Sequence, residues 1–447
     1  MRTYVMIFLA GSLLGNTGPT LAYDPVTHQD MSEKAFNASA LVTDPTILEN
    51  LGLPPLARKQ TFSNSEPFPS QREIFGLFRD GADFEDANTR AMNHFFNPLT
   101  GKGLTVGGNT YSASPDWAID GKGDPSTVQF SFKAARQYLW EAVANGSNSY
   151  AYRQKQFGLM FETLGHVIHH LQDMAQPQHV RDEMHCDLLP CEIVGLYNPS
   201  LYESFTKDEG QAAGHLTYGG YDPVYSSADP ATFNTPRNFW TTTTNANTGK
   251  GIAEYTNRGF VSKMTNFDNA VFSSPQLDPA NIIPTDIGSL CAWEAASAHT
   301  PCPPGLNLSG TMLMIANTVT DNYRESQKAV NPFASTASIY DEDLKDAGKG
   351  AIFSLNRFNF NTAQDLLIPR AVGYSAGLIN YFFRGKMQIS LPDEGVYGIV
   401  DHSVEKTIDV SGFRTIKLKL ANMTPGEAMG AGELVAVAKF GLGRACA

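Results

Sequence analysis

The stretch that decides the fold reads FGLMFETLGHVIHHLQDMAQPQHVRDEMH and runs from Phe157 to His185. Its apolar residues recur at the spacing of an amphipathic helix, at Phe157, Met160, Leu164 and Ile168. Pro177 marks where this helix is expected to end. On such a helix His169 and Asp173 lie one turn apart and face the same side, which is typical of a metal-chelating pair.

Glu162 and His166 extend the same face toward the start of the helix, so a stripe of polar side chains runs through an otherwise apolar segment. If this stripe is buried, its side chains need hydrogen-bonding or metal partners. Histidines are concentrated here, at positions 166, 169, 170, 179 and 185. Imidazole and carboxylate groups are the ligands that zinc prefers, so the stretch predicts a zinc site. A histidine-rich solvated face is the alternative interpretation.

The composition indicates a globular chain. At 447 residues the length allows two to three domains, and 42% hydrophobic residues provide an ample core. The formal net charge of −12 argues against a broad basic surface for nucleic acid, so no stable nucleic-acid complex is expected. A nuclease whose metal ions hold the phosphate remains compatible with this charge.

Residues 1–22 have the pattern of a secretory signal peptide. Arg2 precedes the apolar run from Tyr4 to Leu14, and Thr20-Leu21-Ala22 supplies a small-residue cleavage site. The mature chain would begin at Tyr23 and be secreted or periplasmic. The most apolar later stretch, residues 362–383, is interrupted by polar residues, so no transmembrane segment is expected after the signal is removed.

Five cysteines in an exported chain indicate disulfide bonds. The pairs closest in the sequence are Cys186 with Cys191 and Cys291 with Cys302, which leaves Cys446 over. His215, His299 and His402 stand alone and are expected at the surface.

The chain from 23 to 385 is expected to form one α-helical domain in which every element is helix or loop. A short turn from Tyr23 is expected to lead into a helix that ends near Leu41, with Thr27 as its N-cap. Helical patterns are also expected in the stretches 69–80, 127–144, from 150 onward, 251–269, 309–329 and 362–383. An acidic loop is expected at 81–86, a Gly- and Ser-rich loop at 99–124, and a long loop or short helices at 214–248.

After Gly385 the apolar residues no longer recur at helical spacing but alternate with polar residues, as they do in β-strands. The alternation is clearest at 415–421 and 434–440, so residues 386–447 are expected to form a β-rich C-terminal module. Its roughly sixty residues are about half the size of a typical β-sandwich, and a complete and an incomplete module both fit. The expected fold class is mainly α, followed by this small β module.

The order of the candidate ligands resembles the zinc-dependent phospholipase C and single-strand nuclease superfamily. His169, Asp173 and His179 follow the spacing H-x3-D-x5-H in the context LQDMAQPQH. Asp86 ends a G-x4-D loop that precedes the aromatic-flanked His94, and Glu203 lies in a YESF context downstream. That family also uses the amino and carbonyl groups of the mature N-terminus, followed by a histidine, which here are Tyr23 and His28.

The resemblance implies a phospholipase C-like fold with three zinc ions. Asp86, His94, His169 and Asp173 would hold the first ion, and His179 and Glu203 part of the second. Tyr23, His28 and Asp173 would hold the third, so that Asp173 bridges two metals and, with Asp86, serves catalysis. The resemblance covers residues 23–205 through motifs, the helical stretch to 385 in general character only, and none of the β module.

Two positions depart from the family. Tyr23 replaces the usual Trp, which matters little because the ligands there are backbone atoms. Pro199 stands where the last histidine belongs, four residues before Glu203, and His185 is the expected substitute. Without it the second zinc site is weakened or replaced.

Alternatives remain for several residues. His166 and His170 are expected to orient ligands or to pack beside them. Asp80 or Asp83 could replace Asp86 as a ligand, and Glu162 either orients His166 or ends the polar stripe.

Three functions fit the sequence. The first is a phospholipase C-like phosphodiester hydrolase, in which metal-activated water attacks phosphorus and the protein makes peripheral contact with a phospholipid surface. The second is a single-strand nuclease, which needs aromatic residues for base stacking; the candidates are Phe95, Phe96, Tyr197 and Tyr202. The third is a non-catalytic secreted zinc-binding protein.

Overall fold

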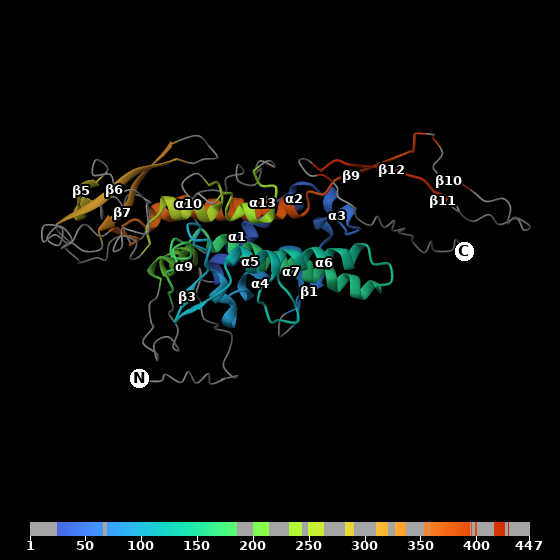
Figure 1. The fold of residues 1–447 in the computed structure, drawn as a ribbon, viewed down its shortest axis with the longest axis horizontal. Helices are drawn as coiled ribbons and strands as arrows, with labels where there is room; N and C mark the ends of the chain where they lie inside the picture. Colours follow the sequence, from blue (N-terminus) through green and yellow to red (C-terminus); the bar gives the residue numbers. More distant parts are fainter. Residues whose placement is uncertain are drawn as a thin grey trace, which may run out of the picture.

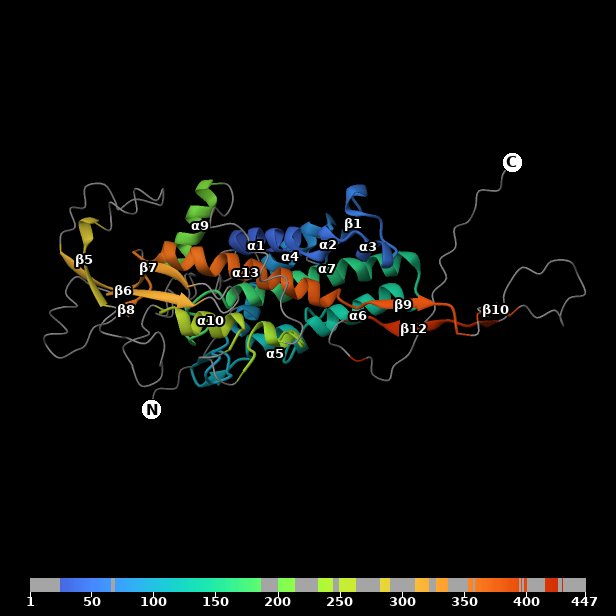
Figure 2. The ribbon, with the colours of Figure 1, turned by 90° about the horizontal axis from the view of Figure 1, so that it is seen from above.

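The protein is mainly α-helical in the computed structural model, which describes residues 25–65, 69–185, 200–213, 232–243, 249–262, 282–289, 310–320, 327–336, 353–356, 358–393, 395, 398–399, 415–424 and 428. A body of helices occupies the middle of the molecule, with a β-sheet at one end and a thin β-ribbon at the other (Figures 1 and 2). The predicted mainly α fold class is therefore confirmed.

The helix at the centre of the body is α7 (Tyr150–Asp173). It begins where the Ser149 hydroxyl accepts a hydrogen bond from the Tyr152 N–H, and it is buried without interruption from Gln156 to Asp173. Its neighbours are α1 (Pro25–Ala38), α4 (Ile74–Phe84), α5 (Ser114–Asp120), α6 (Phe132–Val143) and α13 (Phe360–Phe382). The polar stripe predicted from the sequence is thus covered by other helices and not by water.

Helices α4 and α7 cross with their backbones nearly in contact. A Cβ atom on Gly81 would lie 2.1 Å from the backbone oxygen of Glu162, and one on Gly165 would lie 2.5 Å from that of Phe78. Only glycine fits at such a crossing. The predicted acidic loop at 81–86 is therefore wrong for residues 81–84, where α4 continues and packs against α7, whereas Glu85 and Asp86 lie in a turn.

The other named helical elements in the described part of the chain are α9 (Leu201–Ala213), with 13 residues, and several shorter ones. The shorter ones are α2 (Ala40–Thr43), α3 (Thr46–Asn50), α10 (Ile252–Gly259) and the 3₁₀ helices η1 (Leu56–Arg58), η2 (Asn88–Asn93) and η4 (Pro236–Phe239). The helices predicted up to Leu41, at 69–80, at 127–144, from 150 onward and at 362–383 are present with shifted ends, and the one predicted at 251–269 is present as α10, with 263–269 outside the described residues. The predicted N-cap at Thr27 is wrong, because α1 already begins at Pro25. The predicted loop at 99–124 is wrong in part, since it contains α5 and a two-stranded hairpin of β3 (Thr105–Val106) and β4 (Asn109–Thr110).

The prediction that the chain to residue 385 holds only helix and loop is wrong. Besides β3–β4 and the pair β1 (Thr61–Ser63) and β2 (Gln71–Glu73), it contains a four-stranded antiparallel sheet. The sheet order is β5 (Ile282–Asp286), β6 (Thr311–Thr320), β7 (Gln327–Thr336) and β8 (Phe353–Ser354). The helix predicted at 309–329 is therefore wrong, because its β-branched residues pair with strands on both sides.

The C-terminal part contains the antiparallel pair β9 (Met387–Ser390) with β12 (Lys419–Asn422) and the shorter pair β10 (Gly398–Ile399) with β11 (Thr415–Ile416). The predicted strand at 415–421 is divided between β11 and β12, and the one predicted at 434–440 lies outside the described residues. Three apolar side chains are exposed in and just after β9, namely Met387, Ile389 and Leu391. Within the described part of the chain no helix has the length and apolar character needed to cross a membrane.

The helix crossing yields the first prediction. Gly81→Ala should destabilise the protein by about 1–3 kcal/mol or more, because the new methyl group overlaps the backbone of α7. Urea denaturation monitored by circular dichroism measures this free energy of unfolding.

Gly76→Ala is the matched control on the same helix. Its Cβ would meet only the flexible side chain of Arg72, at 3.4 Å, so the change should be neutral or mildly stabilising. Equal stability of the two variants would show that the helices do not cross this closely.

Candidate metal centre

The structure brings together eight of the nine predicted ligand residues in one buried cluster. They come from α1, the end of α4, the end of η2, α7, the turn after α7 and α9, and are His28, Asp86, His94, His169, Asp173, His179, His185 and Glu203. The ninth, Tyr23, lies outside the described residues. Residues far apart in the sequence therefore share one interior site.

The first group consists of three close ligand atoms, from His94, His169 and Asp173, with Asp86 beside the two histidines. His94 Nδ1 and His169 Nε2 lie 3.3 Å apart, and they lie 3.1 and 3.2 Å from Asp173 Oδ2. The same two nitrogens lie 3.5 and 3.6 Å from Asp86 Oδ1. Ligands about 2.0–2.1 Å from a tetrahedral metal ion are about 3.3 Å from one another, so these atoms could hold one ion.

Hydrogen bonds fix which ring nitrogen most of these histidines present. The Nδ1–H of His169 donates to the Ala82 carbonyl oxygen at 2.6 Å, and that of His28 donates to Gln172 Oε1 at 2.7 Å. His179 and His185 likewise direct Nδ1 at the carbonyl oxygens of His94 and Glu183, each at 3.3 Å. A neutral ring that donates through Nδ1 carries its lone pair on Nε2, which is the arrangement found in metal-binding histidines.

A second group comprises His179, His185 and Glu203, whose ligand atoms lie within 4.8 Å of one another. His185 Nε2 lies 2.8 Å from Glu203 Oε1, and His179 Nε2 lies 3.9 Å from the same oxygen. Gln176 donates a hydrogen bond to this carboxylate at 2.9 Å and thereby holds it in place. His185 thus lies where the sequence expected a substitute for the histidine missing at Pro199. The predicted disulfide between Cys186 and Cys191 lies outside the described residues.

His28 lies beside the first group, next to His169 and Asp173. Its ring stacks on His169 with centroids 3.7 Å apart, and its Nε2 lies 3.3 Å from Asp173 Oδ1. The two oxygens of Asp173 therefore face different partners, since Oδ2 faces His94 and His169. Such a carboxylate could be shared by two metal ions.

The buried carboxylates of the cluster favour a positive charge among them, since despite burial the carboxylate of Asp173 raises the pKa of His94 to about 10. Burial raises the pKa of Asp86 to about 7, and burial also raises the pKa of Glu203. Burial lowers the pKa of His28 to about 4, so this ring is neutral. Both oxygens of Asp86 and of Asp173 are buried without a hydrogen-bond donor among the described residues. A divalent cation would stabilise these carboxylates in their ionised form.

Glu85 is a buried residue of the site that the sequence analysis missed. Its carboxylate accepts hydrogen bonds from His166 at 2.6 Å, His170 at 3.0 Å and Trp117 at 2.9 Å, and it pairs with Arg90 at 2.7 Å. Although burial opposes its ionisation, Arg90 and the histidines hold its pKa well below the usual value. Because Arg90 already supplies the positive charge, we assign Glu85 to hydrogen bonding and not to metal binding.

The hydrogen bonds around Glu85 bear on the roles considered for His166, His170 and Glu162. His166 and His170 bind Glu85, and His94 Nε2 lies 3.8 Å from the same carboxylate, so Glu85 orients rings at the site. Its only sequence signal is its position directly before Asp86. The role considered for Glu162 as the orienting group of His166 is wrong, since its carboxylate accepts the Ser65 backbone N–H.

The alternative ligands considered for Asp86 lie outside the cluster. Asp80 pairs with Arg72 and accepts a hydrogen bond from Asn64, and Asp83 accepts one from Gln29. His215, His299 and His402 lie outside the described residues.

Comparisons of the chain with protein-family models, with curated proteins and with solved structures find no match. The resemblance to the phospholipase C and nuclease superfamily therefore depends on the sequence motifs alone.

A second prediction separates Asp86 from its neighbours on α4. Asp86→Asn should lose about one equivalent of metal per chain, because an amide is a poorer ligand than a carboxylate at a four-ligand site. Inductively coupled plasma mass spectrometry of the folded, gel-filtered protein measures the content.

Asp80→Asn is the control, because Asp80 binds Arg72 and Asn64 away from the cluster, and it should keep the wild-type metal content. Loss of metal from both variants, or from neither, would contradict the assignment of Asp86.

A third prediction concerns the second group. His185→Ala should lose about one equivalent of metal, because it removes one of the three ligand side chains that the described residues contribute to that group. His170→Ala is the control, since its two ring nitrogens bind Ser114 and Glu85. If His185→Ala retains its metal as His170→Ala does, the second group holds no ion through His185.

Proposed function

We propose that this protein is an exported zinc-dependent phosphodiester hydrolase of the phospholipase C kind. The observation that carries the proposal is the close grouping of His94, His169 and Asp173, with Asp86 beside both histidines, inside a buried network of oriented imidazoles. Nitrogen and oxygen ligands at this spacing suit zinc. Three ions are proposed, held by this group, by His179 with His185 and Glu203, and by His28 with Asp173 and the Tyr23 backbone.

Zinc ions bound in these groups would lower the pKa of a shared water molecule and offset the negative charge of a phosphodiester. The side chains of this chain supply the arrangement around them. Asp173 directs its two oxygens at different histidines and so links the groups, while Glu85 holds His170 and faces His94. Asp86 completes the first group with an oxygen that no other described side chain binds through a hydrogen bond.

The packing of the aromatic residues argues against a base-stacking pocket built from the residues considered for it. Phe95, Phe96 and Tyr202, considered as base-stacking residues, are each at most 2% exposed. Phe95 stacks on His179 with ring centroids 4.3 Å apart, so it supports a candidate ligand instead of presenting a face to a base. Tyr197 lies outside the described residues. We therefore rank a single-strand nuclease second.

A phospholipid substrate requires contact with a lipid surface, and export would bring the protein to one. The exposed apolar side chains of β9 and the residue after it, at 45–62% exposure, suit such peripheral contact. The placement of His185 beside Glu203 also weakens the case for a non-catalytic zinc protein, because that case depended on an incomplete second site.

A substrate panel tests the proposal. Phosphatidylcholine vesicles, other phospholipids and single-stranded DNA are incubated with the purified protein, with and without a chelator, and phosphomonoester products are measured. We expect chelator-sensitive release from phospholipid, and Asp86→Asn should reduce the rate by at least about a hundredfold. Cleavage of DNA alone would support the nuclease, and metal binding without any hydrolysis would support the non-catalytic protein.

A further inference from the structure

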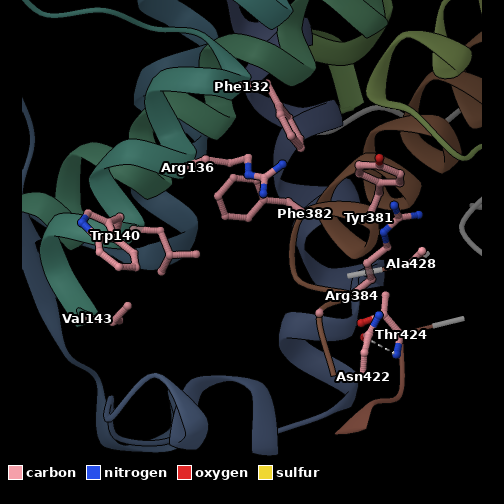
Figure 3. Close-up of a pocket in the computed structure, with 12 residues that line it drawn as sticks. Phe132, Arg136, Trp140, Val143, Tyr381, Phe382, Arg384, Asn422, Thr424 and Ala428 are labelled. Carbon is pink, nitrogen blue, oxygen red and sulfur yellow. Dashed lines mark hydrogen bonds between the residues drawn. The ribbon is translucent and has the colours of Figure 1, made fainter. Parts of the chain in front are cut away.

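A cavity of about 520 Å³ lies between α6, the C-terminal end of α13 and the end of β12 (Figure 3). Its residues are Phe132, Arg136, Leu139, Trp140, Val143, Tyr381, Phe382, Arg384, Gly385, Asn422, Thr424 and Ala428, none of which belongs to the candidate metal centre. This volume is in the usual range for a small-molecule site.

Helix α6 turns part of its apolar surface toward the cavity. Phe132, Ala135 and Ala142 are buried in the core, as expected for the inner face of a surface helix. Leu139, Trp140 and Val143 lie on an adjoining face at helical spacing and line the cavity, and Trp140 remains 39% exposed. A cluster of apolar side chains beside a cavity indicates a surface that binds an apolar group.

The charge in the cavity is positive. Among the described residues that line it, the charged ones are Arg136 and Arg384 and none is an aspartate or glutamate, although the whole chain has a formal net charge of −12. Arg384 lies over the Tyr381 ring at 3.7 Å, which fixes its position on the α13 side. Figure 3 shows Arg136 reaching from α6 toward Phe382, near the junction of the two walls.

We propose that this cavity binds a single-chain amphiphile with one anionic head group. Arg136 and Arg384 would bind the anion, because a guanidinium group suits a carboxylate or a phosphate. Asn422 and Thr424 add polar groups on the β12 side, and the alkyl chain would lie against Leu139, Trp140 and Val143. This inference does not rest on the proposed phosphodiester hydrolysis.

Isothermal titration calorimetry of the full chain tests the proposal, with decanoate and decyl phosphate below their micelle concentrations as probes. We expect saturable binding of at least one probe, and the stronger of the two identifies a carboxylate or a phosphate head group. Decanol should bind at least about tenfold more weakly, a difference of about 1.4 kcal/mol. Decanol binding as tight as that of both anions would overturn the proposal.

Variants locate the binding site. Arg136→Gln should weaken binding about tenfold or more, and Val143→Asp should weaken it further by placing a charge on the apolar wall. Lys133→Gln is the control, because Lys133 is an exposed cation on the same helix that does not line the cavity.

Asp86→Asn separates this site from the candidate metal centre, and it should leave the binding of both probes unchanged. Equal affinity in wild type, Arg136→Gln and Val143→Asp, or a loss of binding in Asp86→Asn alone, would overturn the proposal.

Discussion

The near contact of α4 and α7 at Gly81 and Gly165 is the constraint on which the site depends. The crossing brings the Ala82 carbonyl oxygen within 2.6 Å of His169, so the α4 backbone orients a histidine of α7. About one turn later α4 ends, and the next two residues, Glu85 and Asp86, lie beside the histidines of α7. A wider crossing would leave the carboxylates of one helix out of reach of the imidazoles of the other.

The interior of this helical body is unusual because its centre is polar. Burial of several imidazoles and carboxylates is costly unless each group has a partner. Glu85 solves the problem for His166 and His170 by accepting their hydrogen bonds while Arg90 balances its charge. The carboxylates of Asp86 and Asp173 lack such donors among the described residues, although histidines lie near them. The protein therefore has two kinds of buried carboxylate, one satisfied by its own chain and the other suited to a cation.

The sequence predicted much of the helical body and the members of the cluster, because helical spacing and the order of histidines and carboxylates are local signals. It failed at 309–329, where apolar and β-branched residues fit both periods and pairing with distant strands decided the outcome. The sequence analysis also missed Glu85, because from the sequence alone this residue looks like an ordinary solvent-exposed glutamate. Only the fold shows that Arg90 and Trp117 donate hydrogen bonds to its buried carboxylate. Both the strand pairing within 309–329 and the role of Glu85 depend on contacts between residues far apart in the sequence, which a local pattern does not contain.

The enclosure of α7 has a consequence for how this protein can change in evolution. An ordinary surface helix accepts polar exchanges on its outer side, so its tolerance of substitution rises and falls with each turn. From Gln156 to Asp173 every residue of α7 is buried, and its neighbours are helices on several sides. This segment has no outward side on which neutral variation could accumulate. Related sequences should therefore vary here only through coordinated exchanges with the surrounding helices, even where the residue itself touches no candidate ligand.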